Sequence, residues 1–272
     1  MQVYFLGPEK TYSYAIADKS FPHHELVPQS NFFDVVRSTL KNTNSVGVLP
    51  IENSSTSDIH ENIDHIFAHK DLEICGEAHA HIRLHLIGQK GAKVEEIKQV
   101  YSHGKAFEQC QKFLDGKDLE IIAVQSTAQA QKEVLERNDP TVVFIGGEIL
   151  AKDSNLEILQ KDISDEKENY TRFVFVRKKQ GNNSKPAEKL TVIFQTKHEA
   201  GALAKVLIEI AVNQGDLQKI ESRPIPGSRA EYSFWADIHT QGQSEILLQM
   251  LPERTTNFRL VGAYDIGQTF EI

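Results

Sequence analysis

The chain has 272 residues, which is enough for one large domain or two of ordinary size. Its 30 Lys and Arg against 38 Asp and Glu give a net charge of −8, which argues against a general nucleic-acid-binding protein. No stretch approaches the roughly 18 uncharged apolar residues that would span a membrane, and no signal-peptide pattern is present. Cys75 and Cys110 have neither metal nor disulfide spacing, so we expect a soluble, cytoplasmic protein with free thiols.

Short apolar runs bounded by turn residues predict the strands of the first two thirds of the chain. Continuous apolar runs such as 121–124 and 142–145 favour strands buried on both faces of a parallel sheet. The predicted strands lie at 3–6, 46–49, 121–124, 142–145 and 173–176.

Helical patterns alternate with these runs. An apolar stripe at 59–67 follows Asp58 and Glu61, which have the spacing of a capping box. A second stripe covers 106–114, and Ser126 with Gln129 predicts another capped helix start. This strand–helix alternation indicates an α/β architecture.

A polar run with Gly and Pro at 178–186 predicts a linker. The pattern then restarts in the order β-α-β-β-α-β, which is typical of a ferredoxin-like domain. Its predicted elements are a strand at 190–196, a helix from Gly201 to about Val212, strands at 217–223 and 231–238, a helix at 244–250 and a strand at 258–264. We therefore predict two domains, at 1–178 and 189–272.

Four polar segments stand at the ends of predicted strands, where ligands bind in open α/β sheets. They are Gly7–Thr11, Pro50–Ser54, Ser102–Gly104 and Asn169–Arg172. Taken singly, each also has an ordinary explanation as a turn, a helix cap or a strand start.

Three histidines, His79, His81 and His85, are the best metal candidates in the sequence. No Asp, Glu or Cys completes an obvious ligand set around them, so we expect no metal. No nucleotide-binding motif is present either, and we expect no cofactor.

Taken together, the segments GPEKTYS, PIENS, SHGKAFEQC, STAQA and NYTRF resemble the prephenate dehydratase family in order and spacing. Gly201-Ala202-Leu203 and the KIESRP segment at 219–224 resemble the two signatures of that family's regulatory ACT domain. The resemblance covers nearly the whole chain. Without a chorismate mutase segment before Met1 or after Ile272, we expect the monofunctional form.

The resemblance implies a two-lobed catalytic domain, like the type II periplasmic binding proteins, followed by a ferredoxin-like ACT domain. Lobe 1 would hold residues 1–76 and 161–178, and lobe 2 residues 77–160. Prephenate would bind in the cleft between the lobes. It would lose water and CO2 there to give phenylpyruvate, on the route to phenylalanine.

The resemblance also implies the site residues. Thr171 would assist the departing hydroxyl, with Asn53, Gln109 and Ser102 as further catalytic residues. Arg172 could offer a planar fork to a carboxylate or instead brace the site. Glu52 has two open roles, in catalysis or in tying down its loop, because an unpaired carboxylate repels a dianionic substrate. The full set of expected substrate-binding residues is Arg172, Glu52, Ser54, Thr11, Ser126 and Thr127.

Phenylalanine is the expected allosteric ligand. It would bind Gly201, Ala202 and Leu203, and a facing wall would be made by Glu221, Ser222, Arg223 and Pro224. The resemblance places such sites at a subunit interface. Because an ACT domain leaves one sheet face for a second copy to cover, we expect a dimer or tetramer through these domains.

Four residues depart from the family pattern: Lys10 and Ser57 replace glycines, Gly104 a proline and Asn62 a threonine. They touch loops near the cleft and bear on substrate preference and rate. Three alternatives stay open: an arogenate dehydratase, a related decarboxylase and a non-catalytic amino-acid sensor. The decarboxylase would lack the Thr-Arg-Phe triplet, and Thr171 and Gln109 argue against the sensor.

Overall fold

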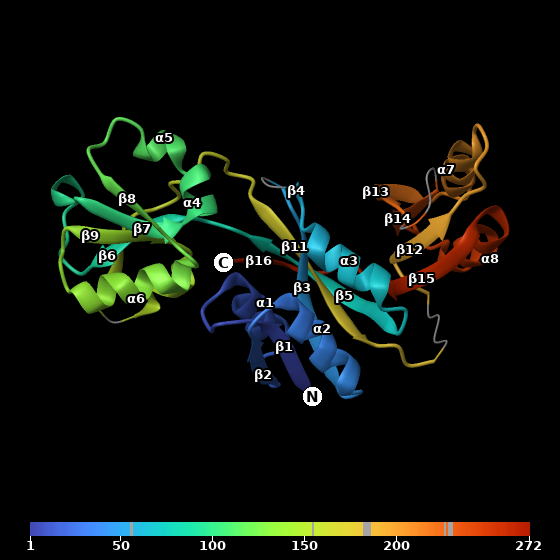
Figure 1. The fold of residues 1–272 in the computed structure, drawn as a ribbon, viewed down its shortest axis with the longest axis horizontal. Helices are drawn as coiled ribbons and strands as arrows, with labels where there is room; N and C mark the ends of the chain where they lie inside the picture. The colour runs from blue at the N-terminus through green and yellow to red at the C-terminus, as the bar shows by residue number, and fades with distance from the viewer. Residues whose placement is uncertain (55–56, 154, 182–185, 226, 228–230) are drawn as a thin grey trace.

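The computed structural model describes residues 1–54, 57–153, 155–181, 186–225, 227 and 231–272. Residues 182–185 of the predicted linker lie outside this range. Three units lie along the long axis, with lobe 2 and the C-terminal unit on either side of lobe 1 (Figure 1). In the described part of the chain, no helix is long and apolar enough to cross a bilayer.

Lobe 1 is built on the sheet order β5-β11-β3-β1-β2. β1 pairs in parallel with β2 and β3, and β11 runs antiparallel between β3 and β5. Because successive side chains of a strand alternate, Val3 and Phe5 pack with α1 while Tyr4 packs with α2 and α3. Its elements are β1 (Gln2–Leu6), α1 (Tyr12–Ser20), β2 (Glu25–Gln29), α2 (Phe32–Lys41), β3 (Ser45–Asn53), β4 (Ser57–Asp58), α3 (His60–Ala68), β5 (Leu72–His81) and β11 (Tyr170–Lys178).

Lobe 2 has a five-stranded sheet of order β10-β6-β9-β7-β8. Its edge strand β8 leaves Ile121 half exposed, so the prediction of burial on both faces is wrong there. The helix predicted across 106–114 is interrupted at Cys110, whose non-helical backbone carries a fully buried side chain. The elements are β6 (His85–Gln89), η1 (Val94–Glu96), β7 (Gln99–His103), α4 (Gly104–Glu108), α5 (Gln111–Leu114), β8 (Glu120–Val124), α6 (Thr127–Arg137), β9 (Val142–Gly146), η2 (Glu148–Lys152) and β10 (Leu156–Gln160).

The C-terminal unit has the predicted β-α-β-β-α-β order, with its strands arranged β13-β14-β12-β15. Helices α7 and α8 cover one sheet face. On the other face, Trp235 and Val261 pack against Ile63 and Ile66 of lobe 1, so lobe 1 covers the face that we expected a second copy to cover. The elements are β12 (Lys189–Gln195), α7 (Ala202–Val212), β13 (Asp216–Pro224), β14 (Tyr232–His239), α8 (Ser244–Arg254), β15 (Thr256–Tyr264) and β16 (Thr269–Glu271).

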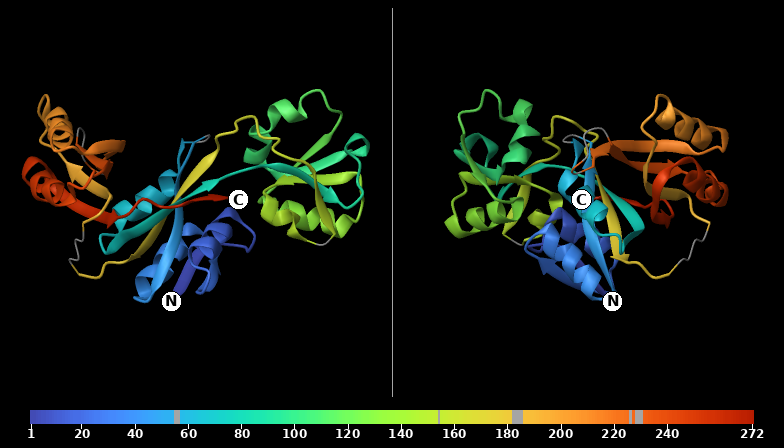
Figure 2. Two further views of the ribbon diagram at one scale, coloured as in Figure 1. Left: turned by 180° about the vertical axis from the view of Figure 1, so that it is seen from behind. Right: turned by 45° about the vertical axis from the view of Figure 1, so that its right-hand side comes forward.

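The unit boundaries differ from the ranges that the resemblance implied. β5 pairs with β11 as far as His81, so residues 77–81 belong to lobe 1 rather than lobe 2. The last strand, β16, leaves the C-terminal unit and pairs in parallel with β5 at 79–81 (Figure 2). An open strand edge carries unpaired backbone groups, and β16 satisfies those of β5.

Candidate functional site

Thr171 and Asn53 meet directly at the centre of the candidate site. They are cross-strand partners on β11 and β3, and Asn53 Nδ2 donates to Thr171 Oγ1 at 2.8 Å. The same amide donates to Asn169 Oδ1 at 2.9 Å. All three side chains are buried. The structure therefore joins the two strand-end motifs PIENS and NYTRF through a hydrogen-bonded trio.

The backbone around this trio is shaped by an irregular pairing. The β3–β11 register shifts between Arg172 and Phe173, where Pro50 has no N–H to donate. Asn62, one of the four departures, is fully buried and donates to the Pro50 carbonyl at 2.7 Å. Ser54 Oγ accepts from Tyr170 N and donates to a neighbouring backbone carbonyl, both at 2.9 Å. Ser54 thus ties the end of β3 to the start of β11.

A cavity of about 320 Å³ lies beside the trio, between lobe 2 and the chain segment that returns to lobe 1. Gln109 lines it from lobe 2 and Asn169 from the returning segment, so Asn169 connects the cavity to Asn53 and Thr171. The lining residues are Glu108, Gln109, Lys112, Ser164, Asp165, Glu166 and Asn169. Asn169 was predicted only as part of the polar segment Asn169–Arg172, without a role of its own, and Lys112 was not singled out from the sequence.

Four other expected site residues serve the scaffold. Ser102 is fully buried and donates to the Ile145 carbonyl at 2.7 Å, which links β7 to β9. Thr11 caps α1 by accepting from Tyr14 N, and Ser126 caps α6, of which Thr127 is the first residue. None of these four described residues lines the cavity beside Asn169.

Arg172 points away from Thr171, because neighbouring side chains of a strand lie on opposite faces. Its Nε donates to Glu77 Oε2 at 2.7 Å, its Nη2 to the Tyr264 hydroxyl at 3.0 Å, and its Nη1 to Asp237. Of the two roles left open for Arg172, these contacts favour the brace over the carboxylate fork.

Glu52 lies on the same face as Arg172. Its Oε2 is 3.8 Å from both Arg172 Nη1 and Lys219 Nζ. These ion pairs favour the structural role for Glu52 over catalysis.

The Arg172 cluster consists of Glu77, Arg172, Lys189, Thr191, Asp237 and Tyr264, all buried. Burial alone would raise the pKa of Glu77, but its contacts with His79, Arg172 and Lys189 hold that pKa well below the usual range. Burial likewise opposes ionisation of Asp237, and the Arg172 charge outweighs it, so its pKa is also lowered. Two carboxylates therefore balance the guanidinium of Arg172 and the ammonium of Lys189, which lies 3.0 Å from Glu77.

Comparison with known proteins decides the family. The prephenate dehydratase profile matches residues 3–181. The chain belongs to the prephenate dehydratase family. It is 33% identical to the prephenate dehydratase of Methanocaldococcus jannaschii, over 97% of this chain and 98% of that protein. It is 32% identical to an Arabidopsis thaliana chloroplastic protein named arogenate dehydratase/prephenate dehydratase 2, over 99% and 74%.

A solved structure shares the fold over nearly the whole chain. The prephenate dehydratase of Arthrobacter aurescens in complex with L-Phe superposes with a TM-score of 0.83 at 26% identity. The match covers 97% of this chain and 90% of that one. The mixed α/β, two-lobed architecture is therefore that of the prephenate dehydratase family.

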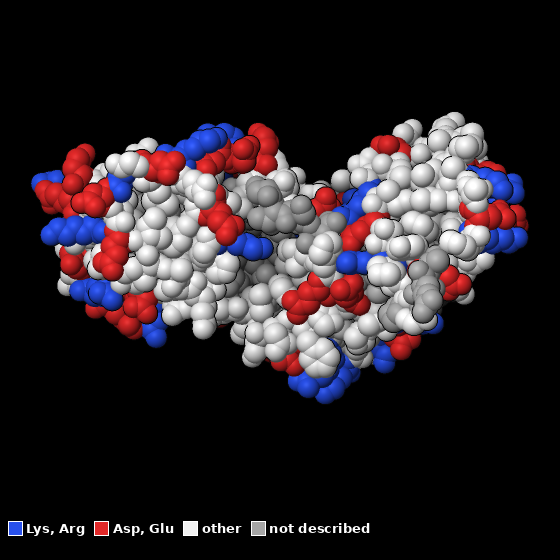
Figure 3. Space-filling view, turned by 45° about the horizontal axis from the view of Figure 1, so that its top comes forward, with Lys and Arg blue, Asp and Glu red and all other residues white. Residues whose placement is uncertain are grey.

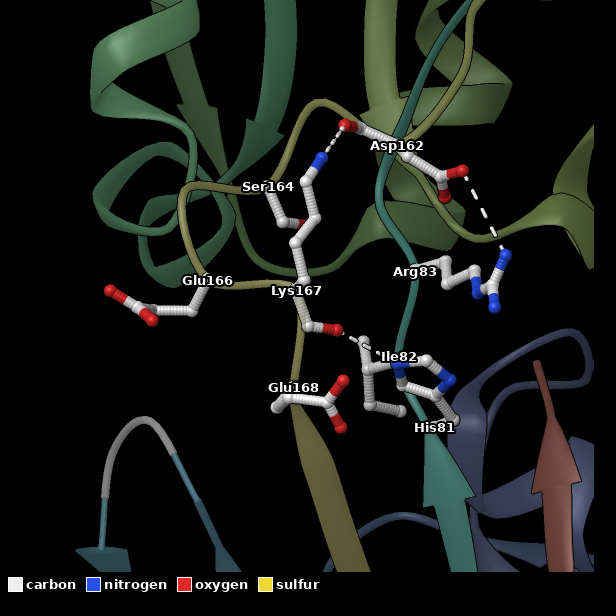
Figure 4. A pocket seen from close by; sticks show the side chains of 8 residues that line it. All are labelled: His81, Ile82, Arg83, Asp162, Ser164, Glu166, Lys167 and Glu168. Atoms are coloured by element: carbon white, nitrogen blue, oxygen red, sulfur yellow. Dashed lines mark hydrogen bonds and ion pairs between the residues drawn. The ribbon is translucent and has the colours of Figure 1, made fainter.

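The three histidines that were metal candidates have other partners in this member of the family. His81 Nδ1 lies 3.0 Å from Glu271 of β16. Its Nε2 lies 2.9 Å from the Lys167 carbonyl, as Figure 4 shows. The Lys167 carbonyl and the Glu271 carboxylate raise the pKa of His81. His85 Nδ1 accepts from Asp162 N at 3.0 Å. Within the described ranges, no group of three or more His, Cys, Asp or Glu residues could hold a metal ion.

The expected phenylalanine residues fall into two places. Gly201, with φ of 80°, is the N-cap of α7 and lines a cavity of about 400 Å³. This cavity is lined by Thr196, Lys197, His198, Glu199, Gly201, Ala202, Leu203, Ala204, Glu231, Tyr232 and Phe234. Glu221 and Arg223 instead face α3, where Arg223 Nη2 lies 2.8 Å from His60 Nδ1. Within one chain, the 221–224 segment therefore does not close the Gly201 cavity.

The remaining departures from the family pattern have local consequences. Lys10 has a φ of 67°, a left-handed conformation in which glycine carries no steric penalty. Gly104 is the first residue of α4, and a side chain there would meet open space. The side chain of Ser57 lies outside the described part of the structure.

Proposed function

We propose that the chain catalyses the conversion of prephenate to phenylpyruvate, CO2 and water, as a carbon–oxygen lyase. The observation that carries the proposal is the Asn53–Thr171–Asn169 trio at the edge of a cavity that Gln109 closes from lobe 2. Free thiols at Cys75 and Cys110 support a reducing compartment, the cytoplasm.

The residues of the trio suit the chemistry of this reaction. Prephenate is a dianion, and its ring hydroxyl leaves as water after taking up one proton. The electron pair of the breaking C–CO2 bond enters the ring, which becomes aromatic as CO2 departs. Because Thr171 Oγ1 already accepts from Asn53, its own hydroxyl hydrogen is available to a leaving oxygen.

The cavity also carries groups for the carboxylates of such a substrate. Lys112 and the Gln109 amide can donate to them, while Glu108, Asp165 and Glu166 surround the same space. Over the face in Figure 3, acidic and basic side chains are interspersed. Substrate attraction therefore depends on the local donors rather than on a single-sign field.

Arogenate is the second candidate substrate, because the relative from Arabidopsis thaliana carries both activities in its name. Arogenate has an amino group where prephenate has a keto oxygen. A cavity with three carboxylates is a setting that can accept this ammonium group.

The C-terminal unit supports a regulatory role as an ACT domain that binds phenylalanine. The Gly201 cavity offers backbone N–H groups at the start of α7, which favour a carboxylate, and the aromatic side chains of Tyr232 and Phe234. The exposed apolar side chains Ile208 and Val212 on α7 support assembly through this unit into a dimer or tetramer. The monofunctional form stays a prediction.

The test is a turnover assay of the full chain with prephenate, followed by the ultraviolet absorbance of phenylpyruvate in alkali. A parallel reaction with arogenate is analysed for phenylalanine. We expect prephenate to be consumed; a folded protein that turns over neither compound contradicts the enzyme assignment and favours the amino-acid sensor. Calorimetry with L-phenylalanine tests regulation separately, and light scattering gives the oligomeric state.

A further inference from the structure

We infer that Arg172 is a positioning residue, which the C-terminal unit holds so that β11 presents Thr171 to the substrate. The inference rests on the proposed function and assigns a further residue to the same site. It starts from two neighbouring cross-strand residue pairs of the lobe 1 sheet. Thr171 pairs with Asn53, and the next pair along the same strands is Arg172 with Glu52.

The two pairs face opposite sides of the sheet. The Asn53 amide donates both to Thr171 and to Asn169, which lines the cavity. Arg172 and Glu52, one residue further on, are both in contact with the C-terminal unit. The sheet face opposite Thr171 and Asn53 is therefore held by the C-terminal unit, which does not line the cavity.

The partners of Arg172 fix the orientation of its guanidinium as well as balance its charge. A guanidinium is planar, so partners at several of its nitrogens fix its position and its plane. Here Nε binds Glu77 of β5, Nη1 binds Asp237 of β14, and Nη2 binds Tyr264 of β15. The acceptors from two different units leave the guanidinium of Arg172, a residue only 6% exposed, one orientation.

The acceptors are themselves held in place. Asp237 Oδ1 accepts from Thr191 Oγ1 at 2.6 Å, and Thr191 Oγ1 lies 2.7 Å from the Tyr264 hydroxyl. Lys189 of β12 binds both oxygens of Glu77, at 3.1 and 3.0 Å. A shift of β14 or β12 would thus move Arg172 and, through the backbone, its neighbour Thr171.

The irregular pairing at this point makes β11 responsive to such a shift. The register change between Arg172 and Phe173 interrupts the ladder that would otherwise fix the strand against β3. On its other edge β11 stays paired with β5 from Tyr170 to Phe175, and the Arg172 side chain adds a restraint from the C-terminal unit. Position matters here because a misplacement of about 1 Å can cost roughly 100-fold in rate.

The experiment compares Asp237→Asn with the matched control Thr240→Val in the full chain. Both residues are fully buried in the C-terminal unit. The Thr240 hydroxyl donates to the Ala187 carbonyl, so its loss removes a buried hydrogen bond outside the Arg172 cluster. Tyr264→Phe, which removes a single acceptor of Arg172, is a milder second variant in case Asp237→Asn does not fold.

We expect Asp237→Asn to lower kcat for prephenate by about 10- to 100-fold with KM within about twofold of wild type. Tyr264→Phe should act in the same direction, and Thr240→Val should leave both constants unchanged. Wild-type kcat in both cluster variants overturns the inference. So does a rise in KM without a fall in kcat, which would indicate that Arg172 binds substrate.

Hydrogen exchange of the backbone amides of residues 170–173 gives a readout that needs no turnover. Exchange should be faster in Asp237→Asn and Tyr264→Phe than in wild type, and unchanged in Thr240→Val. Equal exchange in all four proteins overturns the inference. An inactive wild type whose exchange follows the expected pattern contradicts the proposed function and leaves the positioning of β11 supported.

Discussion

Two neighbours in the sequence, Thr171 and Arg172, have opposite surroundings. Thr171 accepts a hydrogen bond from Asn53, whose amide also bonds to Asn169 at the cavity, whereas Arg172 contacts the C-terminal unit. The NYTRF motif predicted that both residues matter, but a motif does not show which face of a strand each residue occupies. The period of two of a β-strand separates their roles once the strand is placed in the sheet.

Replacement of Thr171 by Ala should reduce kcat by about 10²–10⁴-fold, because the leaving hydroxyl loses a positioned donor. Stability should change little, since the Thr171 side chain is small and lies at the start of β11. Steady-state kinetics and a thermal melt measure the two quantities. Thr171→Ser keeps the hydroxyl and should recover much of the rate; near-normal turnover in Thr171→Ala removes Thr171 from the mechanism.

The buried carboxylates Glu77 and Asp237 predict a steep loss of stability in acid. Their pKa values are lower in the folded chain than in the unfolded one, so the unfolded chain binds more protons as the pH falls. Their stabilisation is complete above about pH 4–5 and is lost progressively below it. Each contributes a slope of about 1.4 kcal/mol per pH unit in that range.

Urea unfolding at several pH values checks this slope. Asp237→Asn should be less stable than wild type at pH 7 by about 3–5 kcal/mol, because it leaves a buried charge without its partner. Below pH 4 the free energy of unfolding of Asp237→Asn should fall less steeply with pH than that of wild type, because the variant lacks one titrating carboxylate. Asp118→Asn, at an exposed position, is the control; a parallel slope in all three proteins contradicts the assignment.

At the level of single elements, apolar runs predicted strands well, and the errors arise where tertiary contacts decide. The sequence of β8 predicts a fully buried strand, but β8 lies at the edge of its sheet, a position that no local pattern reveals. α3 begins at His60 with Ile59 in the N-cap position, one residue later than the start that Asp58 and Glu61 predicted. β16 has no periodic signal at all, since three residues become a strand only through their pairing with β5.

The start of α4 offers a test of local stability. Gly104 occupies the first helical position, where proline is favoured, and His103 has φ −68° and ψ 143°, which a following proline tolerates. A side chain at Gly104 meets no atom within 4 Å. Gly104→Pro should therefore raise the free energy of unfolding by about 0.4–1 kcal/mol, mainly by restricting the unfolded chain.

Chemical denaturation of Gly104→Pro measures this gain. Gly104→Ala is the matched control, because it fills the same space without fixing φ. A destabilised proline variant would show that the backbone N–H of residue 104 has a partner that the proline removes.

Across the whole molecule, the sequence predicted the units but not how they contact. The resemblance named Thr171, Asn53 and Gln109 as site residues. Gln109 and Asn169 line one cavity, and Asn169 bonds to Asn53, the partner of Thr171. Glu77 and Asp237 carry no motif, and they lie 160 residues apart in the sequence numbering. Their meeting at Arg172 depends on the packing of one unit on another, which local patterns do not encode.

Removal of residues 269–272 should destabilise lobe 1 rather than the C-terminal unit. Ile272 is buried, and burial of such a side chain contributes about 1.5–3 kcal/mol. Glu271 also leaves His81 and Arg83 when the segment is absent. A thermal melt of a variant ending at Gln268 should shift downward, whereas Ile266→Ala, at a half-exposed position, should melt as wild type does.

The pairing of β16 with β5 also has a consequence for the order of events during synthesis. The sheet edge at His79–His81 leaves the ribosome well before its partner at Thr269–Glu271, which lies 190 residues later in the chain (269 − 79). Until then the nascent lobe 1 carries an open strand edge and an Arg172 without Asp237, and open edges of this kind favour misassembly with other chains. The yield of folded protein should therefore depend on chaperone supply more strongly than the size of the chain suggests.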